Sequence, residues 1–355
     1  MNYSQYAHHK ISINKYKGLS FEELATEIFN NDKKYLNIIS KSINSPKTTP
    51  DKKIELQNFL QYFYNHFEPN YIKPEITTLI QSHPFWTPPI INIPCNKIIN
   101  NIIHLSDIHI RLYNRSKEYL NVFDKLYTII DKLILNNPNQ IIIITGDLLH
   151  SKNTLSPECI LTTQNFIIKL ASYATTLLIA GNHDALLTNN QREDSITAIF
   201  EKVNIPNFYY LKNSAVYSIS NLAIAVNSII DNKWIYSNSF QLPNISHKIA
   251  LYHGPVGLCD TGVGYRLRGE KLIEDFDGFD FVLLGDIHKF QFLDPENKRI
   301  AYASSLIAQN FNEWNSPHGF LHWDLINHNH IYHPIENDCG FFVFNLNDNH
   351  IFIEE

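Results

Sequence analysis

Cysteine is scarce in this 355-residue chain, which contains four cysteines and no CxxC pair. Cys95, Cys159, Cys259 and Cys339 lie far apart in the sequence, and this spacing argues against both a zinc knuckle and a disulfide framework. We therefore expect reduced thiols that are mostly buried.

A long apolar run is also missing. No stretch approaches the roughly 20 uninterrupted apolar residues that a membrane helix needs. The first ten residues, MNYSQYAHHK, lack the apolar core of a signal peptide. We therefore expect an intracellular, cytoplasmic protein that does not associate with a membrane.

Positive charge is not in excess, since the net charge is −6 and the isoelectric point is about 6.3. A protein that coats nucleic acid non-specifically is usually basic. The acidic total does not exclude a nuclease, because bound divalent metals would supply positive charge where phosphate binds. The phosphate-loop pattern GxxxxGK[ST] is absent too, so we do not expect ATP hydrolysis by that route.

Residues 1–98 read as a small helical region that ends in a proline-rich linker. Ser20 and Glu23 have the spacing of a capping box, and Pro50 stands at the first position of a second helical pattern. The closely spaced prolines of residues 84–94 are typical of an extended linker. This region has no catalytic motif.

From about residue 99 the pattern changes. Short apolar runs end in polar motifs and alternate with helical patterns, which suggests sheets covered by helices in an α/β domain over residues 99–330. One expected helix begins near residue 116, and another covers residues 157–174. The expected strands are 100–105, 141–145, 177–180, 208–212, 215–219, 222–228, 248–253, 281–285, 299–303 and 319–325.

Five polar motifs stand at expected strand ends, where open α/β sheets bind their ligands. They are Asp107-Ile-His109, Gly146-Asp147, Gly181-Asn182-His183-Asp184, His253-Gly254 and Gly285-Asp286-Ile-His288. Each motif alone is weak, because a single strand-end Asp is often a helix cap and a single His is more often structural. All five in this order would rarely arise by chance.

These residue types suit a site with two metal ions. Two divalent ions about 3.5–4 Å apart repel each other, and a carboxylate between them offsets the repulsion. Neutral imidazoles then complete the ligand shells without excess charge. A set of carboxylate, amide oxygen and imidazole suits Mn²⁺, Fe²⁺ or Zn²⁺. The absence of cysteine ligands argues against a structural zinc site.

The series DIH, GDLLH, GNHD, HG and GDIH resembles the pattern of calcineurin-like metallophosphoesterases over roughly residues 99–326. More narrowly, residues 104–109, His150, and the stretches 299–310 and 319–324 are similar to SbcD-type nucleases of double-strand-break repair, including phage and giant-virus counterparts. The resemblance implies a four-layer α/β sandwich of two mixed sheets flanked by helices. It is also consistent with a viral protein that is made in a host cell.

The resemblance implies a role for each matching residue of the metal site. The implied ligands are Asp107, His109 and His288 for the first ion, Asn182 and His253 for the second, and Asp147 as the bridge between them. His183 would protonate the leaving oxygen, and Asp184 would orient His183. His150 would contact the phosphate or the attacking water.

One position departs from the family pattern. The last motif is usually Gly-His-x-His, and Asp286 takes the place of its first His. If Asp286 ligates the second ion, its charge favours harder ions, so we expect Mn²⁺ first, with Mg²⁺, Fe²⁺ and Zn²⁺ as alternatives. The other interpretation is that Asp286 does not ligate and the second site is weak.

The positive residues near the motifs are Arg111, Arg115, Lys117, Lys152, Arg266, Arg268 and Lys289. Arg111, Arg115 and Lys152 are candidate phosphate or DNA contacts. A solvated surface position is the favoured interpretation of each residue alone, and the loop 111–117 is the best candidate as a group. In SbcD-type proteins a capping domain follows, and then a segment that binds the ATPase partner. We interpret residues 331–355 as the start or remnant of such a cap. An SbcC-type ATPase is a possible partner, but we expect the segment that binds it to be absent. A homodimer is also possible.

The favoured function is two-metal hydrolysis of phosphodiester bonds in DNA, as an exonuclease or endonuclease of repair or recombination. One alternative is a phosphomonoesterase or small-nucleotide phosphodiesterase with the same site. A protein Ser/Thr phosphatase fits less well, because that branch has GDxVDRG and GNHE where this chain has GDLLHSKN and GNHD. A non-catalytic scaffold is the alternative of another class, and the retained metal-site histidines argue against it.

Overall fold

The computed structural model describes residues 86–353, except for 112–114, 190–191, 232, 314–315, 342–343 and 348–349. The chain divides into the units Met1–Thr87 and Pro88–Glu355. The helices expected in the N-terminal region lie outside the described residues. Within the described part of the chain, none of the helices combines the length and the apolar character that a membrane crossing requires.

Six strands form one mixed sheet in the order β15-β14-β2-β3-β4-β5. Strands β2 to β5 are parallel, and β14 pairs antiparallel with both β2 and β15. The bounds are β2 Asn101–Leu105, β3 Gln140–Thr145, β4 Thr175–Ile179, β5 Phe208–Tyr210, β14 Gly319–Asp324 and β15 Asn329–Pro334. The sheet therefore continues past residue 330.

Seven strands form a second mixed sheet in the order β1-β6-β7-β8-β11-β13-β12. The pairs β6–β7 and β12–β13 are antiparallel, and the other pairs are parallel. The bounds are β1 Ile90–Ile93, β6 Ala215–Ile219, β7 Leu222–Asn227, β8 His247–His253, β11 Phe281–Gly285, β12 Gln291–Phe292 and β13 Ile300–Tyr302. Strand β1 falls within the expected linker, and its extended backbone pairs with β6.

The described helices are α5 Ser116–Asn136, α6 Pro157–Tyr173, α7 Ser195–Phe200 and the 3-10 helices η4 Ile273–Phe276 and η5 Phe311–Glu313. Two small antiparallel hairpins pair β9 Leu258–Asp260 with β10 Arg266–Arg268, and β16 Phe344–Asn347 with β17 His350–Ile353. The start of α6 is determined by the local sequence. The side chain of Ser156 caps the helix by accepting a hydrogen bond from the N–H of Cys159, and Pro157 occupies the first helical position.

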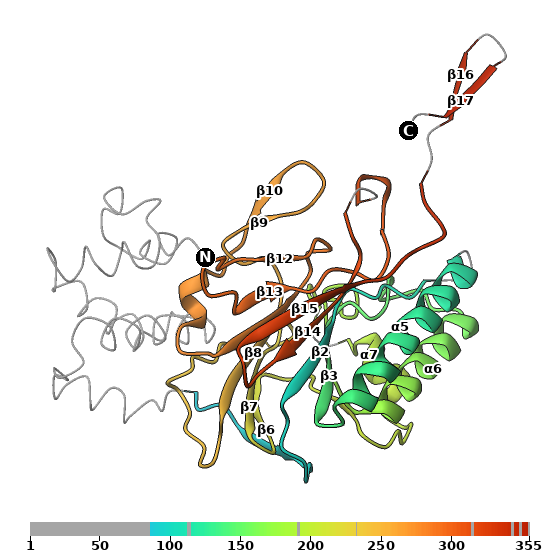
Figure 1. Cartoon of the computed structure of the whole chain (residues 1–355). Coiled ribbons are helices and arrows are strands. Elements are labelled where there is room, and N and C mark those ends of the chain that lie inside the picture. The colour runs from blue at the N-terminus through green and yellow to red at the C-terminus, as the bar shows by residue number, and fades with distance from the viewer. Residues whose placement is uncertain are drawn as a thin grey trace, which may run out of the picture. The chain divides into compact units, whose positions relative to one another are not determined.

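The isoleucines of β3 show how the layers pack. Ile141 and Ile143 belong to the core between the two sheets, whereas Ile142 and Ile144 belong to the core under α5, α6 and α7. Successive side chains of a strand point to opposite faces, so one continuous apolar run fills two cores. Figure 1 shows α5 and α6 side by side along the six-stranded sheet.

On the outer face of the seven-stranded sheet, η4 and the loop that contains Trp234 pack against β8. Tyr252 of β8 contacts Trp234 and Phe276, with ring centroids 5.2 and 6.3 Å apart. The described part of the chain is thus an α/β fold of two mixed sheets packed face to face with helical elements outside them. The expected fold class is confirmed.

Candidate metal centre

Strand ends from both sheets meet at Thr145, the last residue of β3. Its carbonyl accepts a hydrogen bond from Nδ1 of His253 (2.7 Å), and its hydroxyl donates to the carbonyl of Leu284 (3.1 Å). Since His253 ends β8 and Leu284 lies in β11, Thr145 ties the six-stranded sheet to the seven-stranded sheet. The predicted residues follow these strands: Asp107 after β2, Asp147 after β3, Asn182 to Asp184 after β4, and Asp286 and His288 after β11.

The backbone at these strand ends is strained. The φ angles of Asp107, His109 and Asp147 are 52°, 51° and 51°, and that of Asp286 is 95°. Residues other than glycine rarely adopt this left-handed region, and it recurs at functional sites. Position 181 requires glycine for another reason, because a Cβ there would lie 2.1 Å from Oδ1 of Asp147.

The side chains converge in two overlapping groups. Asp107, His109 and His288 form one group, Asp107, Asp147 and His253 form the other, and the ligand atoms of each lie within 4.8 Å of one another. Asp147 stands between the two, with Oδ2 3.5 Å from Nε2 of His109 and Oδ1 3.4 Å from Nε2 of His253. A carboxylate that faces a different imidazole with each oxygen is suited to bridge two ions.

Hydrogen bonds fix the tautomers of two histidines. A carbonyl can only accept, so Nδ1 of His253 must donate to Thr145, which leaves Nε2 with a free lone pair when the ring is neutral. Nδ1 of His288 lies 2.9 Å from Oε1 of Glu313, which likewise directs Nε2 towards the centre. A histidine that ligates through Nε2 needs this arrangement.

Buried polar atoms without partners show that this donor set fits divalent cations. Nε2 of His253 and Oδ1 of Asn182 are buried and have no hydrogen-bond partner among the described residues. Nε2 of His109 and Nε2 of His288 lie 3.0 Å apart. Because buried polar atoms are normally paired, unpaired lone pairs that converge on one place point to cations between them.

Asp286 lies beside the residues predicted for the second ion. Its Oδ1 accepts from Nδ2 of Asn182 (3.0 Å) and is 3.8 Å from Nε2 of His253. Its backbone N–H donates to the carboxylate of Asp107 at 3.1 and 3.2 Å. The side chain therefore lies beside Asn182 and His253, and the main chain holds the carboxylate of Asp107.

A third group joins His109 to His150 and His183, again with ligand atoms within 4.8 Å of one another. Nδ1 of His183 donates to the carbonyl of His150 (2.7 Å), and the two rings stack 5.5 Å apart. Asp184 instead accepts from the backbone N–H groups of Gly181, Leu148 and Leu149. The His150 carbonyl thus holds the His183 ring, and Asp184 acts on it through the loop backbone.

Burial and neighbouring charge set the protonation of the centre in the absence of ions. Burial, partly offset by His288 and His253, raises the pKa of Asp107 to about 6. Burial also raises the pKa of Asp147, but His253 and His109 beside it outweigh that effect and hold the pKa well below its usual range. Burial, followed by the charge of Arg111, lowers the pKa of His150 to about 4, so that ring is neutral near pH 7.

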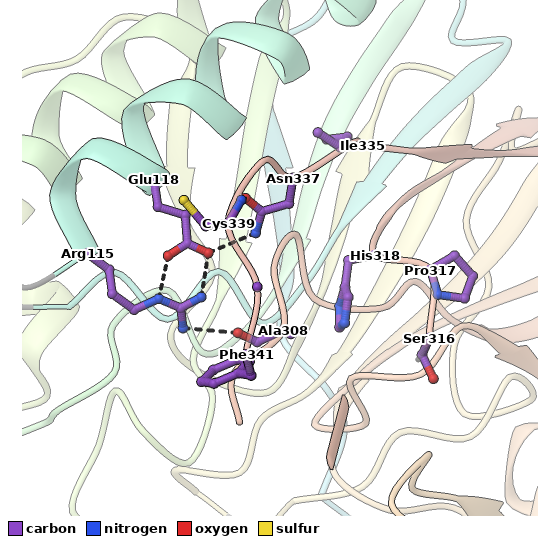
Figure 2. A pocket seen from close by; sticks show the side chains of 11 residues that line it. Arg115, Glu118, Ala308, Ser316, Pro317, His318, Ile335, Asn337, Cys339 and Phe341 are labelled. Carbon is purple, nitrogen blue, oxygen red and sulfur yellow. Dashed lines mark hydrogen bonds and ion pairs between the residues drawn. The ribbon is translucent and has the colours of Figure 1, made fainter. Parts of the chain in front are cut away.

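Arg115, a predicted DNA contact, is engaged inside the protein. It forms two hydrogen bonds to Glu118 (2.6 and 2.5 Å) and one to the carbonyl of Ala308 (3.0 Å). Figure 2 shows this cluster at the edge of a cavity of about 400 Å³, where Asn337 also donates to Glu118 and the ring of Phe341 lies by the guanidinium. Arg115 therefore joins the start of α5 to the loop before η5.

Arg111 and Lys152 also have partners, but they stay beside the centre. Nη2 of Arg111 donates to the carbonyl and the side-chain oxygen of Gln309 at 3.0 and 2.7 Å. Nζ of Lys152 donates to the carbonyl of Asn182 (2.9 Å). A cavity of about 230 Å³ borders both Arg111 and His150. Arg115 lines the same cavity, whereas Lys152 is not among its lining residues.

The sequence analysis missed Glu313. This carboxylate is only 6% exposed, lies 2.9 Å from the His288 ring and accepts from the N–H of Gln309 (2.7 Å). The only available signal was its position three residues after Asn310, at the end of the stretch that resembles nucleases. That spacing does not by itself indicate a metal site.

Comparisons with known proteins agree with this geometry. A family model described as "Calcineurin-like phosphoesterase" matches residues 101–290. An uncharacterized protein of Acanthamoeba polyphaga mimivirus is 41% identical over 260 residues, which are 70% of this chain and 19% of that protein. The chain thus spans about a fifth of the length of this curated relative.

Two solved structures are similar at low identity. The calcineurin-like phosphoesterase YfkN from Bacillus subtilis has 12% identity and a TM-score of 0.38, and the alignment covers 72% of this chain and 88% of that one. The phosphoesterase Yfce from E. coli has 13% identity and a TM-score of 0.30, with 65% and 96% covered.

Glu313→Ala should weaken metal binding at the His288 side of the centre. Without the carboxylate, the imidazole of His288 loses its orientation and tautomer, and such changes typically lower metal affinity or activity about 10–100-fold. Calorimetric titration of the metal-free protein with Mn²⁺ would measure the loss. Glu193→Ala, which removes a carboxylate paired with Lys212, is the matched control. Equal affinities in both variants would rule out the positioning role.

Proposed function

Since the chain belongs to the calcineurin-like phosphoesterase family, we propose that it is a nuclease that hydrolyses phosphodiester bonds in DNA with two divalent ions. The coarser description, a metal-dependent phosphoesterase, follows from the family and from its His and Asp clusters. The observation that carries the proposal is Asp147, whose two oxygens face His109 and His253 separately.

The chain's own residues account for the chemistry. Asp107, His109 and His288 would hold one ion, and Asn182 and His253, joined by Asp286, the other. When bound, the ions would neutralise phosphate charge and make water a better nucleophile.

His183 is the proposed general acid. Its Nδ1 is occupied by the carbonyl of His150, so Nε2 is the atom left to hold a proton and pass it to the leaving oxygen. The neutral ring of His150 stacks against His183 and can accept a hydrogen bond from an incoming water. Both rings contact the ring of His109, one of the residues that would hold the first ion.

DNA is proposed as the substrate because a residue of the stretch 299–310, which resembles SbcD-type nucleases, contacts Arg111 beside the centre. Gln309, in the stretch 299–310, holds Arg111 beside the cavity that also borders His150. A nuclease of this kind would act in repair or recombination. The rival is a small phosphoester substrate, which needs the same ions but no contact with Arg111.

Asp147→Asn should abolish hydrolysis and release at least one ion, because a neutral amide no longer offsets the repulsion between two cations. Activity is measured with Mn²⁺ on labelled single- and double-stranded DNA, with p-nitrophenyl phosphate esters in parallel. Mass spectrometry gives the metal content, and circular dichroism verifies the fold. Asp131→Asn, on the exposed side of α5, is the matched control.

Two outcomes of that assay would contradict the proposal. Wild-type hydrolysis of the small esters without any cleavage of DNA would favour the small-phosphoester alternative. Full activity in Asp147→Asn would remove the two-ion site itself.

His183→Ala should slow the chemical step about 10²–10⁴-fold, the range for positioned proton transfer. Metal content should stay close to that of the wild type, because His183 is proposed as an acid and not as a ligand. Single-turnover kinetics and metal analysis test both points. Loss of the ions together with the activity would identify His183 as a ligand and exclude the acid role.

Asp286→His should shift the metal preference from Mn²⁺ towards softer ions such as Zn²⁺, because imidazole replaces a hard carboxylate oxygen. Asp286→Ala should lower activity at low metal concentration and recover part of it at high concentration. Activity is titrated with each metal for the wild type and both variants. If wild type and Asp286→Ala give the same curves, Asp286 does not ligate.

A further inference from the structure

A two-stranded ribbon, β9 and β10, lies outside the seven-stranded sheet (Figure 1). Residues 258–268, here called the arm, include the ribbon and the turn that joins its strands. Tyr265 is 60% exposed, and Arg266, Leu267 and Arg268 after it are exposed as well. The arm thus presents an aromatic ring and two guanidinium groups to solvent.

The arm is anchored next to a predicted metal ligand. Nζ of Lys289 lies 2.6 Å from the carboxylate of Asp260, and the Gln291 side chain makes two hydrogen bonds with the Asp260 backbone (2.7 and 2.9 Å). Lys289 directly follows His288 in the chain. A Cβ at Gly262 would lie 3.3 Å from Cβ of Lys289, so the turn also packs on this segment.

The two arginines of the arm share one face. They are two residues apart on β10, so their side chains project on the same side, separated by about 7 Å along the strand. Arg266 lies opposite Asp260, whose carboxylate is bound to Lys289. Arg266 is close enough to that carboxylate for its charge to help lower the pKa of Asp260, after the effect of Lys289, but among the described residues neither guanidinium forms a salt bridge.

We propose that the arm binds a single strand of DNA and guides it towards the metal centre. Arg266 and Arg268 contact successive phosphates, and Tyr265 stacks on an unpaired base. The inference rests on the proposed nuclease function and adds where the substrate strand lies. Because Asp260 is fixed to the segment after His288, the bound strand is kept beside the ions.

A single strand fits the arm better than a duplex. Guanidinium groups bind phosphate through charge-assisted hydrogen bonds, and an exposed Tyr beside them is the combination that recognises single-stranded nucleic acid. Stacking on Tyr265 needs a base whose face is free, and the bases inside a duplex already stack on each other. The arginines here are unpaired, unlike Arg111 and Arg115, so no internal contact must break for them to bind.

The double variant Arg266→Ala with Arg268→Ala should bind single-stranded DNA more weakly and with less salt dependence. Fluorescence anisotropy of a labelled thymidine oligonucleotide, in EDTA to prevent cleavage, measures affinity over a range of salt concentrations. Each lost phosphate contact lowers the slope of log affinity against log salt by about 0.7 on single strands, so about 1.4 is expected. Lys132→Ala with Lys202→Ala, which removes two exposed charges elsewhere, should leave the slope unchanged.

Tyr265→Ala should weaken binding by about 5- to 150-fold without changing the salt slope, since stacking is not ionic. Tyr265→Phe keeps the ring and should bind like the wild type. A duplex of the same length should compete poorly with the oligonucleotide. Equal binding by the arm variants and the lysine control would overturn the proposal, and so would arm-dependent binding of the duplex alone.

Cleavage with Mn²⁺ separates this inference from the function on which it rests. If wild type cleaves DNA and the arm variants cleave it with unchanged KM, the nuclease function stands and the arm is not its strand-binding site. If wild type hydrolyses small aryl esters but never DNA, the nuclease function itself fails. The expected result is a raised KM for single-stranded DNA in the arm variants and an unchanged kcat.

Discussion

The hydrogen bond from Nδ1 of His253 to the carbonyl of Thr145 is the contact on which the centre depends. It joins a strand of each sheet at their ends, and it also sets which nitrogen of His253 is free to bind a cation. The two strands lie so close together here that positions 146 and 285 have no space for a side chain. A Cβ at Gly146 or at Gly285 would lie within 2.7 Å of Nδ1 of His253. The same hydrogen bond thus determines how the two sheets pack and which nitrogen of His253 can bind a cation.

Much of this arrangement could be predicted from the sequence. The run Ile141–Ile144 indicates a strand buried on both sides, and motifs at the ends of such strands must meet when the strands are parallel neighbours. Glu313 could not be found in this way, because its partner His288 is 25 residues away and the 3-10 helix that places it has no periodic signal. Strand β1 was hidden too, since a proline-rich extended segment also suits a linker.

Surface cations were the part of the site that the sequence described least well. Whether an arginine is free depends on residues that folding brings to it, such as Gln309 for Arg111 and Ala308 for Arg115, each more than 190 positions away. Arg111, Arg115 and Lys152 have internal partners, whereas Arg266 and Arg268 are exposed.

The left-handed backbone of Asp107, His109, Asp147 and Asp286 implies that destabilising substitutions disturb the metal centre before they unfold the protein. Each such conformation costs on the order of 1 kcal/mol or more, a sizeable share of a typical folding free energy of about 5–15 kcal/mol. The packing of the surrounding hydrophobic cores must hold these four residues in their strained conformation. A substitution that loosens a core should therefore change the backbone first at these residues, because relaxation there releases the most strain energy. An inherited or engineered change deep in the protein can therefore leave it folded, abundant and catalytically silent, and a solubility screen would pass such a variant as normal.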